Sequence, residues 1–264
     1  MADARADLTR AVANVAAEAG QMALARWRTD FRRWEKTPGS PVCEVDLDVD
    51  AMLRVRLAAL LPDAGWLSEE SVDNADRLGC ARVWVVDPID GTRDYIRGRD
   101  GWAVSVALVE DGQATIGVLD APARRERWCA TVGTGAWRNG VRLRAGTRTS
   151  LPGARVPTDA LPKADRDLTP VHKPNSIALR IAMVAADEAD LVATLRWGNE
   201  WDIAAAALIA AEAGAGIGDA LGMPLRFNTA DARAFGVLAA APGIHDAAVD
   251  RLAARARTLL GDPA

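Results

Sequence analysis

The sequence predicts an α/β (α+β) protein with two lobes, an N-terminal one over residues 1–145 and a C-terminal one over residues 146–264. Two stretches with helical periodicity, residues 7–28 and about 46–61, precede a series of apolar or alternating runs separated by turn residues. A segment rich in Pro, Gly and polar residues, about 145–175, then separates this half from one in which apolar helices alternate with short strands.

Composition excludes several classes of protein. Half of the 264 residues are hydrophobic and 26% are charged, which is typical of a soluble globular chain. The net charge of −4 argues against a nucleic-acid partner, and no apolar signal segment or membrane span is seen. Three scattered cysteines, Cys43, Cys80 and Cys129, favour a reducing cytoplasm. With only two histidines, catalysis must use carboxylates, hydroxyls and metal.

The first elements in chain order are two helices joined by a loop. Leu8, Val12 and Val15 begin the apolar face of the helix at 7–28, and residues 35–46 read as a turn-rich loop. The second helix begins at about Asp46, where an acid is stabilised by the helix dipole, and Pro62 ends it.

Acidic side chains follow two predicted strands. A short strand at 66–71 contains Glu69 and Glu70, and the apolar run 83–86 leads to Asp87 and Asp90 before it breaks at Gly91-Thr92. Mg²⁺ takes oxygen ligands of this kind, and such a turn leaves backbone N–H groups free for a phosphate. The alternative is an ordinary Asp-rich turn at the end of a strand.

The remaining elements complete the two lobes. Strands at 102–109, 114–119 and 127–131, with turns at Asp111-Gly112 and Asn139-Gly140, predict an antiparallel sheet covered by the two helices. The second lobe is predicted to contain helices at 176–186, 203–213 and 244–260 and strands at 190–193 and 233–241.

Five acids therefore stand at the ends of elements: Glu69, Asp87, Asp90, Asp202 and Asp46. If they share one cleft, their charges raise each other's pKa values, and bound Mg²⁺ removes that cost. The spacing alone leaves open that they are separate surface groups.

Three motifs resemble those of the inositol monophosphatase superfamily: Asp87-Pro-Ile-Asp-Gly-Thr92 after Trp84-Val-Val, Ser68-Glu-Glu-Ser71 upstream, and Trp201-Asp-Ile-Ala-Ala-Ala downstream, ending in Glu212-Ala-Gly. The resemblance extends from Lys36 to the terminal helix. It implies a layered αβαβα sandwich of the inositol monophosphatase/fructose-1,6-bisphosphatase type. It also implies a Mg²⁺-dependent, often lithium-sensitive phosphomonoesterase with two or three metal ions per site.

The same resemblance implies roles for individual residues. Glu69, Asp87 and the Ile89 carbonyl correspond to ligands of a first metal ion. Asp87, Asp90 and Asp202 correspond to ligands of a second. Glu69 and Asp90 are thereby also assigned as catalytic residues. The reaction implied is the in-line attack of a water on a small phosphate monoester.

Further residues are assigned around the reacting phosphate. Thr92, hydrogen-bonded to Asp46, resembles the group that orients the attacking water, and the backbone N–H groups of Gly91 and Thr92 would meet the phosphate. Glu200 and Asp202 are also assigned to substrate binding, and Glu70 to a third ion or a nearby water.

Departures from the family pattern bear on the substrate. Relatives that act on inositol phosphates carry a glutamate where this chain has Leu195, whereas Glu200-Trp201-Asp202 resembles the 3′(2′),5′-bisphosphate nucleotidase branch. We therefore expect a nucleotidase, although that branch commonly has Leu where Ile89 stands. Cys43 replaces the usual Thr and leaves the hydrogen bonding of its loop open.

The alternatives are an inositol-1-monophosphatase, a histidinol-phosphatase or another sugar phosphatase, and a metal-binding homologue without turnover. A fructose-bisphosphatase activity is favoured only if Lys173, Arg180 and Arg196 make the pocket of the second lobe basic. Many relatives are homodimers, but no interface can be read from the sequence.

Overall fold

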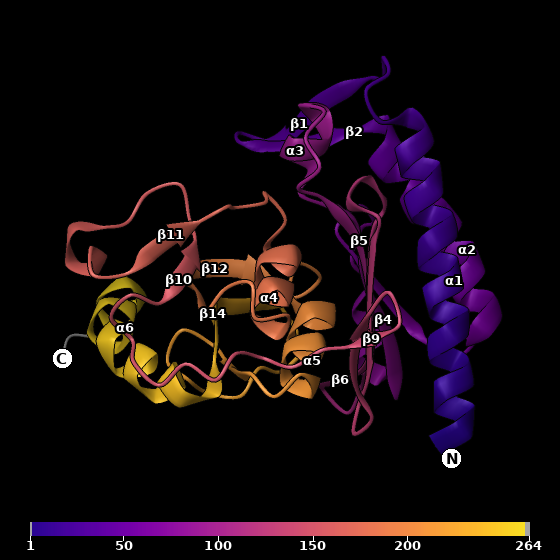
Figure 1. The fold of residues 1–264 in the computed structure, drawn as a ribbon. Coiled ribbons are helices and arrows are strands. Elements are labelled where there is room, and N and C mark those ends of the chain that lie inside the picture. The colour runs from indigo at the N-terminus through magenta and orange to yellow at the C-terminus, as the bar shows by residue number, and fades with distance from the viewer. Residues whose placement is uncertain (1, 262–264) are drawn as a thin grey trace.

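The computed structural model describes residues 2–261 and has the predicted layered α/β architecture (Figure 1). Two long helices form the outermost layer, followed by a large sheet, two short helices, a small sheet and a closing helix. No helix within residues 2–261 is both long and apolar enough to cross a membrane.

The helices are α1 (Ala2–Arg26), α2 (Glu44–Leu60), α3 (Thr92–Ile96), α4 (Ile177–Ala185), α5 (Ala204–Glu212) and α6 (His245–Leu260). Short 3₁₀ turns are η1 (Ala75–Gly79), η2 (Pro122–Arg124), η3 (Lys163–Asp165) and η4 (Pro242–Ile244). The strands are β1 (Arg33–Thr37), β2 (Ser40–Cys43), β3 (Gly65–Ser68), β4 (Arg82–Asp90), β5 (Ala103–Glu110), β6 (Gln113–Ala121), β7 (Glu126–Thr131), β8 (Gly135–Arg138), β9 (Val141–Arg142), β10 (Arg155–Pro157), β11 (Thr169–Val171), β12 (Leu191–Asn199), β13 (Gly216–Gly218) and β14 (Arg233–Ala240).

The large sheet has the strand order β3-β4-β5-β6-β7-β8-β9. Its pairs are antiparallel as predicted except for β3 and β4, which run parallel. Trp84 and Val86 pack under α1 and α2 on one face, while Val83 and Val85 belong to the core on the other face, around α4 and α5. The central strand is therefore buried on both faces, which explains its unbroken apolar run.

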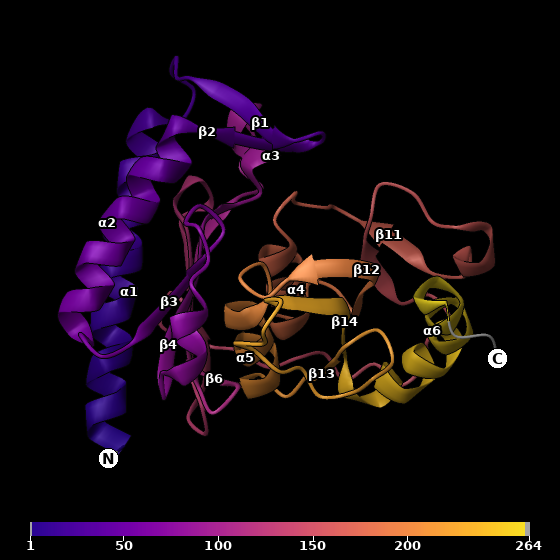
Figure 2. The ribbon, with the colours of Figure 1, turned by 180° about the vertical axis from the view of Figure 1, so that it is seen from behind.

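The small sheet has the antiparallel order β12-β14-β13. Its inner face shares one core with α4, α5 and the large sheet, and α6 packs on its other face (Figure 2). Since this core is continuous between the two sheets, it does not mark a boundary between lobes. The predicted division at residue 145 therefore stays a prediction.

The loop prediction for residues 35–46 is wrong in part. Residues Arg33–Thr37 and Ser40–Cys43 form a two-stranded hairpin, β1-β2, that turns at Gly39, and α2 begins at Glu44. Every residue of β1 is exposed, so this strand carries no apolar alternation that sequence reasoning could detect.

The close approach of α5 to the large sheet gives a test of this packing. A Cβ added to Gly117 on β6 would lie 2.5 Å from the backbone oxygen of Ala205. We expect Gly117→Ala to lower the free energy of unfolding by about 1–3 kcal/mol, because backbone at this contact has to move. Urea unfolding measures this change. Gly79→Ala is the control, since a Cβ there meets nothing within 4 Å. Equal stability of both variants would contradict this packing.

Candidate active site

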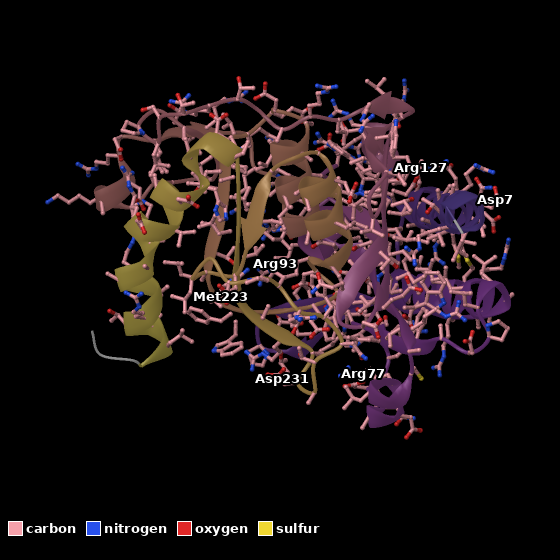
Figure 3. The ribbon with its side chains drawn as sticks, turned by 90° about the horizontal axis from the view of Figure 1, so that it is seen from below. Asp7, Arg77, Arg93, Arg127, Met223 and Asp231 are labelled. Carbon is pink, nitrogen blue, oxygen red and sulfur yellow. The ribbon has the colours of Figure 1, made fainter. Side chains whose placement is uncertain are left out.

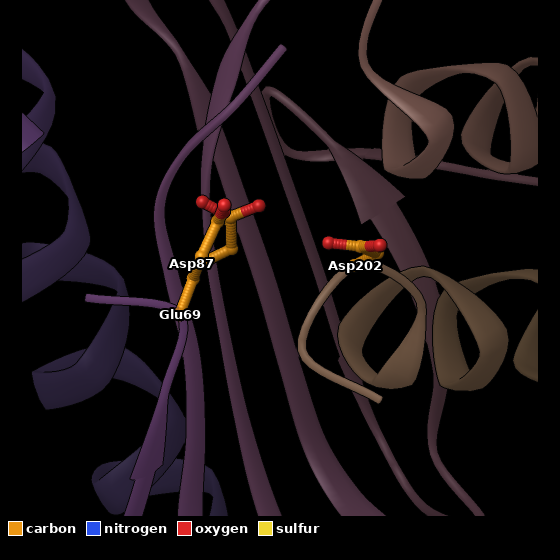
Figure 4. Close-up of side chains that lie close together, drawn as sticks. All are labelled: Glu69, Asp87 and Asp202. Atoms are coloured by element: carbon orange, nitrogen blue, oxygen red, sulfur yellow. The ribbon is translucent and has the colours of Figure 1, made fainter. Parts of the chain in front are cut away.

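Three carboxylates from separate elements converge between the two sheets. Glu69 directly follows β3, Asp87 lies on β4, and Asp202 precedes α5. One oxygen from each carboxylate lies within 4.8 Å of the other two. Figure 4 shows Glu69 and Asp87 side by side, with Asp202 facing them from the start of α5.

A β-bulge brings Asp87 and Asp90 to the same cleft. Asp87 pairs with Ser105 and Asp90 with Ala103, so β4 has one more residue than β5 between these pairs. In a regular strand, residues three apart point to opposite faces, and an inserted residue changes this alternation. Pro88 lies within the irregular stretch, where the lack of a backbone N–H is tolerated. Both acids line a cleft of about 290 Å³.

Asp90 is bound by the N-terminus of α4. Its Oδ2 accepts hydrogen bonds from Ser176 Oγ at 2.5 Å and Ala178 N at 2.7 Å, and Oδ1 accepts one from Ile177 N at 3.3 Å. A helix N-terminus stabilises negative charge through its free N–H groups and its dipole. Ser176 also caps α4 by accepting from Leu179 N, a role that sequence reasoning did not assign.

Burial and mutual repulsion oppose ionisation of these acids. Burial raises the pKa of Asp87 and Asp202 well above the usual range, and the neighbouring charges of Glu69 and Asp90 raise both further. Burial raises the pKa of Asp90 to about 6 against the hydrogen bonds from α4. Clustered carboxylate oxygens suit Mg²⁺, whose charge would favour the ionised forms. The residues present therefore fit a hard divalent cation.

Thr92 and Asp46 form a second polar group beside these acids. Thr92 Oγ1 lies 3.2 Å from Asp46 Oδ1 and 3.0 Å from the carbonyl oxygen of Ile89. Since a hydroxyl carries one hydrogen, it donates to only one of the two at a time. Asp46 Oδ2 accepts from both the backbone N of Cys43, at 2.8 Å, and its Sγ, at 2.9 Å. The thiol thus supplies the side-chain hydrogen bond that a hydroxyl would make there.

Glycine is required where α3 begins. Gly91 has φ +96°, and a Cβ there would lie 2.6 Å from the carbonyl oxygen of Gly101 and 2.9 Å from Ser176 N. This residue therefore lets the β4–α3 turn lie against the start of α4.

Lys36 is a charged neighbour of the site that sequence reasoning did not single out. Its Nζ lies 2.6 Å from Glu70 Oε1 and 3.6 Å from Glu69 Oε1, and it donates to the Glu69 carbonyl at 3.1 Å. The Glu70 side chain is only 2% exposed, and its salt-bridge partner is the Lys36 ammonium group. A role for Glu70 with a third ion stays a prediction.

The structure does not bring Glu200 to the cleft. The residue is fully buried and its carboxylate accepts from the backbone N of Asn228 at 2.5 Å and of Thr229 at 2.9 Å. Asn228 in turn accepts from Arg77 of η1 at 2.6 Å. Arg77 and Asp231 mark the two sides of this junction in Figure 3. Glu200 thus holds the β13–β14 loop, whose Asn228 in turn contacts η1.

Three arginines line the cleft together with the acids: Arg93 of α3, Arg180 of α4 and Arg196 of β12. None of the three forms a salt bridge within residues 2–261; Arg93 donates to the carbonyl of Gly39, and Arg180 donates to the carbonyls of Ser176 at 3.3 Å and Asn175 at 3.0 Å. Burial lowers the pKa of Arg180 against the attraction of the Asp90 charge, and the charge of Arg196 lowers it further. Lys173 is instead paired with Asp159, and Leu195 packs into apolar clusters away from the acids.

Comparison with known proteins agrees with this geometry. The sequence model of the inositol monophosphatase family matches residues 4–258. A Thermotoga maritima protein named fructose-1,6-bisphosphatase/inositol-1-monophosphatase is 32% identical over 74% of each chain. The 3′(2′),5′-bisphosphate nucleotidase CysQ of Escherichia coli is 33% identical over 73% of this chain and 82% of its own. A solved IMPase structure from Thermotoga maritima has a TM-score of 0.80 at 28% identity and covers 94% of this chain and 97% of its own.

The repulsion among the acids predicts an unusual pH dependence of stability. A carboxyl group whose folded-state pKa is raised contributes stability that is present below its unfolded pKa and lost as pH rises through the folded value. In EDTA, we therefore expect Asp87→Asn to raise the melting temperature at about pH 8 more than at about pH 5. A gain of about 3 °C corresponds to roughly 1 kcal/mol of relieved repulsion in a chain of this size.

Thermal melts of the metal-free protein at the two pH values measure the difference. Asp63→Asn is the matched control: Arg82 lowers the pKa of Asp63, so this substitution should give no gain at the higher pH. A destabilised Asp87→Asn protein at about pH 8 would show that the acids do not repel one another in the fold.

Proposed function

The chain belongs to the inositol monophosphatase family, and on this premise we propose that it is a 3′(2′),5′-bisphosphate nucleotidase. Members of this family are Mg²⁺-dependent phosphatases that act on small phosphate esters. The proposal concerns which ester this chain hydrolyses and which of its residues hold the metal ions and the substrate.

The observation that carries the proposal is the pair of guanidinium groups of Arg180 and Arg196. Two guanidinium groups that form no salt bridge within residues 2–261, in a cleft that acids also line, favour a substrate with a second anionic group. The scissile phosphate would lie at the acids and the second phosphate at the arginines. A substrate with one phosphate leaves at least one arginine without an anionic partner.

Within this proposal, Glu69, Asp87 and the Ile89 carbonyl would hold one Mg²⁺, and Asp87, Asp90 and Asp202 would hold another. Bound Mg²⁺ supplies charge neutralisation at the phosphate and acidifies a coordinated water. Thr92 and Asp46 orient the attacking water: Asp46, fixed by Cys43, accepts the Thr92 hydrogen and leaves the Thr92 oxygen as an acceptor. The backbone N–H groups of Gly91 and Thr92 are proposed to meet the phosphate.

A sugar bisphosphatase is the second candidate, because the same arginines would hold the second phosphate of such a substrate. The name of the Thermotoga maritima relative includes this activity. Inositol 1-phosphate and histidinol phosphate carry one phosphate each, and the inositol candidate is further weakened by Leu195. A metal-binding homologue without turnover is disfavoured, because the chain keeps the Thr92–Asp46 pair beside the acids as well as the acids themselves.

Substrate choice is tested by phosphate release, with Mg²⁺, from adenosine 3′,5′-bisphosphate, fructose 1,6-bisphosphate, inositol 1-phosphate and histidinol phosphate. We expect the highest kcat/KM for the nucleotide. Arg196→Ala should raise KM for both bisphosphates about tenfold or more and leave KM for inositol 1-phosphate nearly unchanged, because it removes a charged hydrogen-bond donor for the second phosphate.

Arg226→Ala is the matched control, since Arg226 is an exposed arginine of the second half outside the cleft. Much faster hydrolysis of inositol 1-phosphate than of the nucleotide would overturn the proposed specificity.

The metal assignment is tested at Asp202. Asp202→Asn should lower Mg²⁺-dependent turnover at least about a hundredfold and keep a cooperative thermal melt, because the ligand is lost while the side-chain shape is kept. Asp202 is a cleaner test than Asp90, where an amide would place an NH₂ group against the N–H donors of α4. Near-normal turnover, measured with excess Mg²⁺, would remove Asp202 from the metal site.

A further inference from the structure

An exposed indole forms part of the cleft wall. Trp197 lines the same cleft as Asp87 and Asp202, and 49% of its surface is exposed. By contrast, Trp84, Trp102 and Trp128 are at most 1% exposed. A large apolar side chain that remains accessible inside a binding cleft offers a contact surface to a ligand.

A second β-bulge produces this exposure. Thr194 pairs with Val237 and Trp197 with Phe235, so β12 has one more residue than β14 between these pairs. Arg196 and Trp197, which a regular strand would place on opposite faces, consequently both line the cleft.

The partner strand is adapted to this bulge. Gly236 has φ +71°, and a Cβ there would lie 2.1 Å from the carbonyl oxygen of Thr194. Because only glycine fits at this point, the irregular pairing is a fixed feature of the small sheet.

Two side chains of β14 also hold the indole in place. The Phe235 ring lies edge-on at 5.5 Å between centroids with an interplanar angle of 67°, and the Arg233 guanidinium carbon lies 5.2 Å from the Trp197 centroid. These contacts restrict the side chain before any ligand arrives, which reduces the conformational entropy lost on binding.

We propose that Trp197 is a specificity-determining residue that stacks on a planar heteroaromatic ring of the substrate, and that of the two bisphosphate candidates the substrate is therefore the nucleotide. The proposal rests on the proposed phosphatase function and refines it. Arg180 and Arg196 fit either a nucleotide or a sugar bisphosphate. Trp197 distinguishes them, because a nucleobase has a flat π-face to stack on, whereas the rings of inositol and fructose are saturated and hydroxylated.

The test compares Trp197→Ala and Trp197→Phe. For Trp197→Ala we expect KM for adenosine 3′,5′-bisphosphate to rise about tenfold to a hundredfold with little change in kcat, because stacking is made in both the ground and transition states. Trp197→Phe should retain most of the affinity, since it keeps an aromatic face. KM for fructose 1,6-bisphosphate should change less than twofold in both variants.

Trp137→Ala is the matched control. This indole also carries an arginine over its ring, Arg142 at 5.8 Å, but it lies on β8 and does not line the cleft. It should leave KM for both substrates unchanged. Equilibrium dialysis of adenosine 3′,5′-bisphosphate, with Ca²⁺ in place of Mg²⁺ to slow turnover, measures binding separately from catalysis.

The outcomes separate the two proposals. If the nucleotide binds and Trp197→Ala selectively weakens this binding, the stacking proposal is supported. If the wild-type protein binds the nucleotide in this way but does not hydrolyse it, only the nucleotidase proposal fails. If the wild-type protein does not bind the nucleotide, the stacking proposal is overturned. It is equally overturned if Trp197→Ala leaves nucleotide binding unchanged or raises KM for both substrates alike, since that would indicate a purely structural residue.

Discussion

Repulsion among buried carboxylates is the constraint on which the structure around the cleft depends. The chain neutralises the outer members of the acidic group itself: the N-terminus of α4 binds Asp90, and Lys36 binds Glu70. In the inner group of Glu69, Asp87 and Asp202, Glu69 lies 3.6 Å from Lys36, whereas Asp87 and Asp202 have no salt bridge within residues 2–261, and burial and neighbouring charges raise the pKa values of these two acids. Polypeptide groups thus hold the periphery of the site, and the centre is left for a divalent cation.

Two bulged strands, one in each sheet, place the side chains of the cleft. The bulge of β4 between Asp87 and Asp90 brings both acids to the cleft, and the bulge of β12 brings Arg196 and Trp197 to it. An extra residue locally changes which face a side chain meets without altering the rest of the strand. The same kind of bulge would therefore serve the proposed chemistry on the large sheet and the proposed recognition on the small sheet. Helices α4 and α5 pack between the two sheets and separate them.

Periodicity was sufficient to predict the long helices and the central strands, because each buries a continuous apolar face or run. It could not show the hairpin β1-β2, whose first strand is exposed throughout, or the parallel pairing of β3 with β4. Motif resemblance pointed to Glu69, Asp87 and Asp202, which the fold brings together. It also pointed to Glu200, yet the partners of that carboxylate lie 28 and 29 residues further along the chain. Contacts of this range depend on the completed fold and leave no local pattern.

The bulge of β12 also accounts for the replacement of a glutamate by Leu195. Leu195 packs against apolar clusters that include Leu191 and Phe235, and its neighbour Arg196 faces the cleft. Because Leu195 is half-buried against these apolar side chains, a carboxylate in its place would lose part of its hydration. The same bulge that turns residue 195 toward the core turns residues 196 and 197 toward the cleft. On this strand the chain therefore presents Arg196 and Trp197 to the cleft, while Leu195, in the place of the polyol-binding glutamate, packs away from it.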